Sequence, residues 1–232
     1  MLKEHISTGS IFVDRVLGGG LLRREVTLLY GEAETGKTSL AIQCAVNSAR
    51  MGFKTLYVDC EGTFTPQRLK QIASRDIEEV SSMIILLTPS TFQEQAEIID
   101  SLERFINKRF GLIVFDTITS LYRSELAERN KTFSLNRELN RQVAILTEIA
   151  KTIPLSVLLL SQVRSSMEGS DFIPVATRIL KFWSNSVIRL SKTDAGNVIK
   201  VSVEKVGGAE AKASFLLIIR NDGIRDYQLM ER

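Results

Sequence analysis

Residues 31–38 constrain the fold of this chain more than any other part of its sequence. They read Gly-Glu-Ala-Glu-Thr-Gly-Lys-Thr and match the pattern G-x-x-x-x-G-K-[S/T]. An apolar run at 26–30 precedes the motif, and a helix-forming stretch follows it from 37 to 51. A glycine-rich loop between a strand and a helix lets backbone N–H groups surround phosphate oxygens. The motif therefore predicts a P-loop, and with it an α/β fold.

The P-loop assigns a role to each of its residues. We expect Lys37 to bridge the β and γ phosphates of ATP and Thr38 to bind Mg²⁺. Glu34 places a carboxylate beside an anion, so we expect it to point to solvent. The alternative is an ordinary turn before a helix, although the motif arises by chance in only about one chain in a hundred of this size. The predicted nucleotide-binding residues are Gly31, Glu32, Ala33, Glu34, Thr35, Gly36, Lys37 and Thr38.

Short apolar runs alternate with amphipathic stretches through most of the chain. The expected strands are 26–30, 54–59, 83–87, 112–115 and 155–160, and the expected helices are 37–51, a helix opened by Pro66, 91–108 and 133–152. On the 91–108 helix, the residues expected to face inward are Ile98, Ile99, Leu102, Phe105 and Ile106. This alternation predicts a mostly parallel sheet covered by helices on both faces. After Lys181, the runs 186–191, 198–204 and 213–220 leave no room for helices, which predicts an antiparallel extension at the sheet edge.

Composition excludes several classes of protein. The 232 residues contain two cysteines and one histidine, which excludes a disulfide scaffold and a histidine metal cluster. No segment has the length and apolarity of a membrane span, so we expect a cytoplasmic chain that makes no contact with membranes. No linker divides the sequence, which predicts a single domain over residues 1–232. The net charge is only +3, with the positive charge concentrated in the second half, a weak indication of a polyanionic partner.

Polar residues end three of the predicted strands. Asp116 follows the apolar run 112–115 and is expected to be the second Mg²⁺ ligand. Glu61 follows the strand at 54–59 and is a candidate general base for a water that attacks the γ-phosphate. Its spacing alone leaves open a second interpretation, in which Glu61 is merely exposed. Gln162 follows the strand at 155–160 and would contact the γ-phosphate or orient the water.

Together these segments resemble the cores of the RecA/RadA recombinases. The resemblance is carried by Ser7-Thr8-Gly9, Asp14, Leu17-Gly18-Gly19-Gly20, the P-loop, residues 57–64, and Leu159 with Ser161-Gln162-Val163. It covers essentially the whole chain and is strongest to a short archaeal paralogue of RadA. The resemblance implies a RecA-like P-loop ATPase core with Glu61 as the catalytic glutamate and Gln162 as the nucleotide-sensing residue.

The same resemblance implies an ATP- and DNA-binding accessory protein of homologous recombination and DNA repair, with weak ATPase activity. Two alternatives remain: a full strand-exchange recombinase, and a nucleotide-dependent signalling ATPase of the KaiC type. The chain departs from the recombinase pattern in several places. No N-terminal helix-hairpin-helix domain is expected, and none of the eleven phenylalanines has alanine three positions later, as the family's docking linker does. Phe182 stands where the family has a histidine, and residues 205–209 replace its nucleotide-capping segment. We therefore expect ATP binding without strand exchange.

The stretches 123–133 and 164–181 align with the two DNA-binding loops of the family. The predicted DNA-binding residues are Arg123, Arg129, Lys131, Arg164, Arg178 and Lys181, and the aromatic residues beside them are Phe133, Phe172, Phe182 and Trp183. Basic and aromatic side chains together suit single strands, because they pair with phosphates and stack on bases. Charge alone would favour ordinary solvent-exposed loops.

The resemblance also implies protein partners. The family's socket for a docking phenylalanine matches Leu56, Tyr57 and Val58, together with the apolar face of the 91–108 helix. A RadA-type recombinase would be the first partner of such a socket, and a Holliday-junction resolvase and a second copy of the chain are further candidates. The alternative is that these three residues belong to the core.

Overall fold

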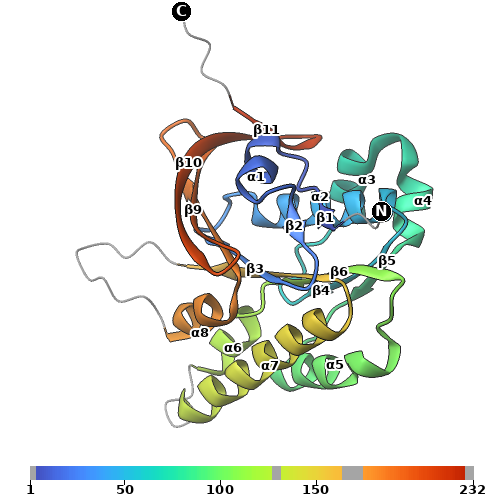
Figure 1. Ribbon diagram of the computed structural model, residues 1–232, viewed down its shortest axis with the longest axis vertical. Helices are drawn as coiled ribbons and strands as arrows, with labels where there is room; N and C mark the ends of the chain where they lie inside the picture. Colours follow the sequence, from blue (N-terminus) through green and yellow to red (C-terminus); the bar gives the residue numbers. More distant parts are fainter. Residues whose placement is uncertain (1–3, 127–131, 164–174, 228–232) are drawn as a thin grey trace, which may run out of the picture.

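The computed structural model describes residues 4–126, 132–163 and 175–227 (Figure 1). Its main feature is a nine-stranded sheet in the order β11-β10-β9-β8-β3-β7-β6-β4-β5. The parallel strands are β3 (Val26–Gly31), β4 (Lys54–Asp59), β5 (Ile84–Leu87), β6 (Phe110–Asp116), β7 (Ser156–Gln162) and β8 (Ser186–Lys192). Three antiparallel strands continue the sheet: β9 (Val198–Val206), β10 (Ala209–Arg220) and β11 (Gly223–Asp226). A separate two-stranded sheet joins β1 (His5–Ile6) to β2 (Leu21–Leu22).

The strand at 186–192 corrects one expectation. It was predicted to open the antiparallel extension, but β8 pairs in parallel with β3, and the antiparallel part begins only at β9. The reason is the helix α8 (Val175–Trp183), which lies in the stretch predicted as a loop. This helix carries the chain from β7 back across the sheet, and a crossover of that kind returns the next strand in parallel.

Helices cover both faces of the sheet, as predicted (Figure 1). On one face lie α1 (Ile11–Val16), α2 (Lys37–Arg50), α3 (Pro66–Ala73), the 3₁₀ turn η1 (Ser74–Asp76) and α4 (Ile77–Ser82). On the other lie α5 (Phe92–Phe105), α6 (Ser120–Glu125), α7 (Thr132–Thr152) and α8. Consecutive strand residues alternate between two buried clusters: Tyr57 packs toward α2, while Leu56 and Val58 pack toward α5 and α7.

Local sequence signals explain where the helices begin. Thr65 accepts a hydrogen bond from the Arg68 backbone and is followed by Pro66 in the first turn of α3. Thr91 caps α5 through the Glu94 backbone N–H. The inward face predicted for α5 is confirmed at Ile99 and Leu102, and at Ile106 directly after the helix, all buried. It is wrong at Phe105, which is 38% exposed because it lies in the last turn.

The first helix is joined to the last strand. The Asp226 carboxylate accepts hydrogen bonds from the Ser10 hydroxyl and from the Ile11 backbone N–H, at 2.9 Å for the latter. Beside this contact, the buried Gln43 side chain of α2 donates to the Thr8 and Ile224 carbonyls at 2.8 and 3.2 Å. Its Oε1 accepts from the Ile224 backbone N–H at 2.9 Å. We call these contacts of Asp226 and Gln43 the terminal clasp. It holds the N-terminal segment and β11 against α2.

Among the described residues, no helix combines the length and apolarity needed to cross a membrane.

Candidate nucleotide-binding site

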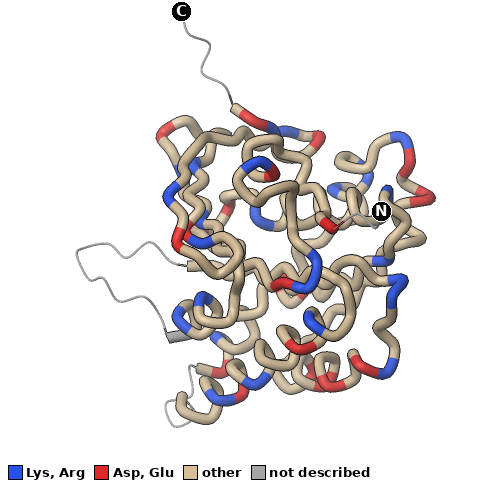
Figure 2. The backbone as a smooth tube through the Cα atoms, in the orientation of Figure 1, with Lys and Arg blue, Asp and Glu red and all other residues tan. Residues whose placement is uncertain are grey.

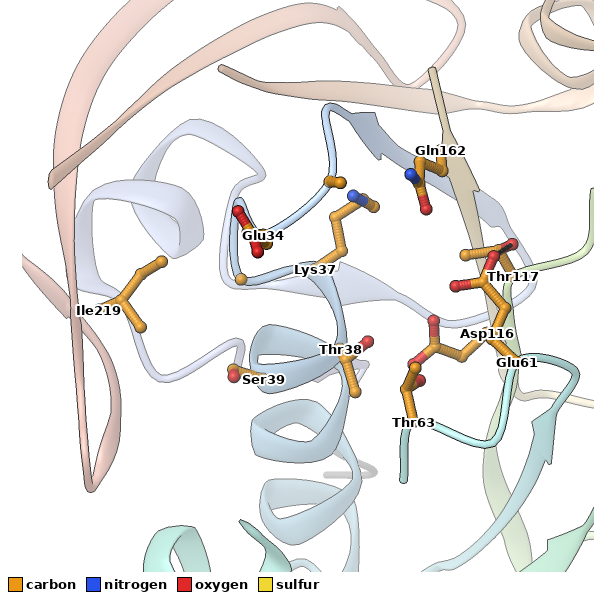
Figure 3. Close-up of a pocket in the computed structure, with 12 residues that line it drawn as sticks. Glu34, Lys37, Thr38, Ser39, Glu61, Thr63, Asp116, Thr117, Gln162 and Ile219 are labelled. Carbon is orange, nitrogen blue, oxygen red and sulfur yellow. Dashed lines mark hydrogen bonds between the residues drawn. The ribbon is translucent and has the colours of Figure 1, made fainter. Parts of the chain in front are cut away.

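The P-loop lies at the carboxyl end of β3, where the geometry of the chain demands glycine. Gly36 has a φ of 79°, a left-handed conformation that lets the backbone turn into α2. A Cβ on Gly31 would lie 2.1 Å from the Leu190 carbonyl oxygen of the adjacent strand. The loop borders a cavity of about 370 Å³. Figure 3 shows its lining residues, which are Ala33, Glu34, Gly36, Lys37, Thr38, Ser39, Glu61, Thr63, Asp116, Thr117, Gln162 and Ile219.

Lys37 provides the positive charge of the cavity. It is only 7% exposed, and its Nζ donates to the Glu32 and Gly31 carbonyls at 2.6 and 3.2 Å. Burial lowers the pKa of Lys37, while the Asp116 and Glu61 carboxylates oppose that shift. Glu34 behaves as expected and points outward, with Lys192 bound to its carboxylate at 2.9 Å. That hydrogen bond and charge lower the pKa of Glu34.

Asp116 ends β6 beside the P-loop and is 1% exposed. The Tyr57 hydroxyl donates to its Oδ2 at 2.7 Å, while its Oδ1 has no hydrogen-bond partner among the described residues. Burial raises the pKa of this carboxyl to about 6, although the hydrogen bond from Tyr57 and the nearby Thr38 hydroxyl favour the ionised form. A buried oxygen left without a partner next to a threonine hydroxyl is a set of donors that suits Mg²⁺.

The metal would depend on the nucleotide for its other ligands. Within the described ranges, no group of three or more His, Cys, Asp or Glu side chains is placed to hold a metal ion. Mg²⁺ commonly binds through one or two protein oxygens together with waters and substrate phosphates. Thr38 and Asp116 therefore fit Mg²⁺ that arrives with a nucleotide.

Glu61 lies across the cavity from the P-loop, in the turn after β4 (Figure 3). The turn is organised by Asp59, whose carboxylate accepts from the backbone N–H groups of Glu61, Thr63 and Phe64 at 3.3, 3.1 and 2.8 Å. The Thr117 hydroxyl donates to Glu61 Oε1 at 2.8 Å. The structure thus brings Lys37, Thr38, Glu61, Asp116 and Gln162 together at one cavity.

Sequence reasoning missed the contribution of two residues to this site. Thr117 holds Glu61, and the only signal for it was its place directly after Asp116. Tyr57 holds Asp116, and it had been predicted to bind a partner instead. Its hydroxyl is completely buried, and burial raises the pKa of Tyr57 well above its usual value, so it remains a hydrogen-bond donor.

Arg123 lies on α6 and not in the expected loop, and its guanidinium faces the nucleotide site. Its contact with DNA stays a prediction. Its Nη1 donates to the Gln162 carbonyl at 3.1 Å, and its Nη2 lies 3.5 Å from Glu61 Oε1. The residue spacing was compatible with a loop, but a six-residue helix turns this side chain inward.

The other predicted DNA-binding residues fall into three groups. Arg129, Lys131 and Arg164, together with Phe172, lie outside the described residues. Arg178 is exposed on α8. Lys181 forms an ion pair with Glu204 at 2.6 Å and stacks 4.6 Å from the Tyr30 ring, so it joins α8 to β9 and β3. Burial alone would lower the pKa of Lys181, but Glu204 and Tyr30 raise it.

Exposed aromatic and basic residues accompany Arg178. Phe133 on α7 is 83% exposed and Phe182 on α8 is 74% exposed. Trp183 is held by a hydrogen bond to Asn140 at 2.9 Å. Figure 2 shows basic residues on α8 and on α7, which packs against it.

Leu56, Tyr57 and Val58 lie in the core, which favours the alternative interpretation of the predicted partner socket. Leu56, Tyr57 and Val58 are all 0% exposed, because β4 lies between β5 and β6 and is covered on both faces. The strand at this edge of the sheet is β5, where Ile85 and Leu86 are 37% and 41% exposed.

Comparison with known proteins agrees with this architecture. The sequence profile of the Rad51 family matches residues 3–227. A DNA repair and recombination protein RadB from Methanococcus maripaludis (strain C7) is 33% identical over 213 residues, which are 91% of this chain and 96% of that protein. The protein of the same name from Thermococcus gammatolerans is 40% identical over 190 residues, 81% of this chain and 83% of the relative.

A solved structure agrees as well. The crystal structure of the RadB recombinase is 33% identical and superposes with a TM-score of 0.81, over 96% of this chain and all of the other. The fold is therefore RecA-like, and the resemblance to a short RadA paralogue is confirmed. On this evidence the chain belongs to the Rad51 family and, within it, to the RadB proteins.

Proposed function

We propose that this chain binds Mg²⁺-ATP, hydrolyses it slowly, and binds DNA as an accessory protein of homologous recombination and repair. The observation that carries the nucleotide part is the cavity lined by Lys37, Glu61 and Asp116, whose Oδ1 has no partner in the described part of the chain. The relatives' names, DNA repair and recombination protein RadB, support the biological part.

Each residue of the nucleotide site has a separate role in the proposed reaction. Backbone N–H groups of the P-loop and the Lys37 ammonium bind the phosphates. Thr38 and Asp116 would hold Mg²⁺, and the metal would neutralise phosphate charge. Glu61 accepts a proton from the attacking water, and Gln162 contacts that water or the terminal phosphate. We expect slow turnover, because residues 205–209 replace the segment that caps the nucleotide in the recombinases that the chain resembles.

The DNA-binding part is supported by the exposed Phe133 and Phe182 side chains and by Arg178. Aromatic faces stack on any base, and arginine pairs with any phosphate, so this surface suits single strands without strong sequence preference. Affinity should therefore fall steeply as the salt concentration rises.

A RadA-type recombinase and a Holliday-junction resolvase remain proposed partners. Support for the recombinase comes from the edge of β5, where Ile85 and Leu86 are exposed. Beside them is a cavity of about 420 Å³ that Leu87 and Ile98 line. An unpaired sheet edge with apolar side chains suits an added strand. Leu86→Lys should weaken binding to a recombinase in a pull-down, and unchanged binding would remove this surface.

The direct test of the nucleotide site compares Lys37→Ala with Lys70→Ala. Lys70 is an exposed lysine of α3 and serves as the matched control. Fluorescent ATP should bind the wild type and the Lys70 variant alike and should be lost from the Lys37 variant. Glu61→Gln should bind ATP normally while phosphate release falls. Equal ATP affinity in the Lys37 variant would contradict the nucleotide site, and unchanged phosphate release in the Glu61 variant would contradict the catalytic role.

A further inference from the structure

The Arg123 side chain joins two elements of the nucleotide site. Its Nη1 donates to the Gln162 carbonyl at the end of β7, 3.1 Å away. Its Nη2 lies 3.5 Å from Glu61 Oε1 in the turn after β4. The Arg123 side chain is 35% exposed and that of Glu61 is 24% exposed, so the pair lies half-buried at the cavity rim. One guanidinium thus connects the proposed general base to the strand that carries Gln162.

The backbone around Arg123 is fixed on both sides. The Ser120 hydroxyl, at the start of α6, donates to the Cys60 carbonyl at 3.2 Å, directly before Glu61 in the chain. Tyr122 is 3% exposed, its ring packs 5.9 Å from that of Phe92, and its hydroxyl donates to Asn136 at 2.6 Å. These contacts anchor the α6 backbone that carries the Arg123 guanidinium.

The contact has a specific effect on Glu61. Oε1 receives the Thr117 hydroxyl at 2.8 Å and the Arg123 cation. Among the described residues, no group donates a hydrogen bond to Oε2. A carboxylate held by two donors on one oxygen keeps the other oxygen available to accept a proton. A general base needs such an oxygen within reach of the water proton.

We propose that Arg123 is a positioning residue for ATP hydrolysis, which holds Glu61 so that Oε2 faces the attacking water. This role rests on the proposed ATPase activity of the site. It replaces the interpretation in which Arg123 binds DNA phosphates. Arg123 acts through Glu61 and has no part in binding ATP itself.

The test compares Arg123→Gln and Arg123→Lys with Arg104→Gln. Arg104 is an exposed arginine near the end of α5 and controls for the loss of one positive charge. Arg123→Gln should lower kcat about tenfold with the KM for ATP and the affinity for fluorescent ATP within about twofold of wild type, because only orientation is lost. Arg123→Lys should recover part of kcat, since the lysine ammonium can still pair with Glu61 but cannot also reach the Gln162 carbonyl oxygen. Arg104→Gln should match the wild type.

A spectroscopic measurement detects the contact without turnover. In ¹⁵N-arginine-labelled protein, the side-chain signal of Arg123, assigned by its absence in Arg123→Gln, should shift in Glu61→Gln and stay unchanged in Glu97→Gln. Glu97 is an exposed residue of α5. An Arg123 side-chain signal with the same chemical shift in Glu61→Gln as in the wild type would overturn the proposal.

The outcomes separate this role from the function on which it rests. If the wild type shows no turnover that depends on Glu61, the proposed ATPase activity fails and the role of Arg123 falls with it. If turnover requires Glu61 but Arg123→Gln leaves kcat unchanged, only the role of Arg123 fails. A variant that loses DNA affinity and keeps its kcat would return Arg123 to the DNA-binding residues.

Discussion

Asp116→Asn should stabilise the protein in the absence of nucleotide. Burial raises the pKa of this carboxyl from 3.8 to about 6. One pKa unit corresponds to about 1.4 kcal/mol, so keeping the carboxylate ionised costs the folded state about 3 kcal/mol at pH 8. Asparagine removes that cost and can still accept the Tyr57 hydrogen bond through its carbonyl oxygen.

The sign of the pH dependence follows from the raised pKa. Above pH 6 the folded wild type carries the buried charge, so the variant should have its full advantage there. As the pH falls from 6 towards 4, the folded carboxyl takes up its proton before the unfolded one does, and the advantage should disappear.

Urea unfolding followed by circular dichroism at pH 5, 6.5 and 8 would measure the difference. Asp194→Asn, at an exposed position, is the matched control and should change stability little at any of these pH values. In thermal unfolding, about 3 kcal/mol corresponds to a rise in midpoint of roughly 6–12 °C for a chain of this size. With Mg²⁺-ATP the order should reverse, because only the wild type gains binding energy from the metal. An Asp116 variant that is less stable than the wild type at pH 8 would refute the reasoning.

Three further changes test the packing around the site. Gln43→Leu should lower the free energy of unfolding by about 3 kcal/mol, since it leaves backbone groups of Thr8 and Ile224 without partners. Chemical denaturation would measure the loss, and a loss below about 1 kcal/mol would argue against the terminal clasp. Tyr57→Phe removes the buried hydrogen-bond donor of Asp116. It should raise the Mg²⁺ concentration needed for ATP binding severalfold in a metal titration, and it should destabilise the fold by about 1–3 kcal/mol in urea unfolding. Lys181→Ala should destabilise the protein more than Arg178→Ala does, because Lys181 is tied to Glu204; equal thermal midpoints would contradict that contact.

The P-loop and the ends of the strands were predictable from the sequence, because local chemistry determines them. A glycine-rich loop between an apolar run and a helix has few folded solutions, and carboxylates that end parallel strands meet at one edge. The direction of β8 was not predictable, since an apolar run has the same pattern whether the neighbouring strand is parallel or antiparallel. Whether Leu56, Tyr57 and Val58 were buried depended on strand order, which puts β4 inside the sheet. The place of Arg123 beside Glu61 was not predictable, because the helix that carries it is held by Cys60, Phe92 and Asn136, all distant in sequence.

The terminal clasp bears on how the protein matures during synthesis. Ser10 leaves the ribosome 216 residues ahead of Asp226, which accepts its hydrogen bond, so the clasp closes long after α2 has been made. Until then α2 lacks the strand that holds one of its sides. The P-loop also lacks Ile219 and Ile224, whose side chains lie beside Gly36. A nascent chain stalled before residue 219 therefore carries the complete phosphate-binding motif without its support. We expect a nascent chain to retain ATP only once β11 has left the ribosome and the clasp has closed.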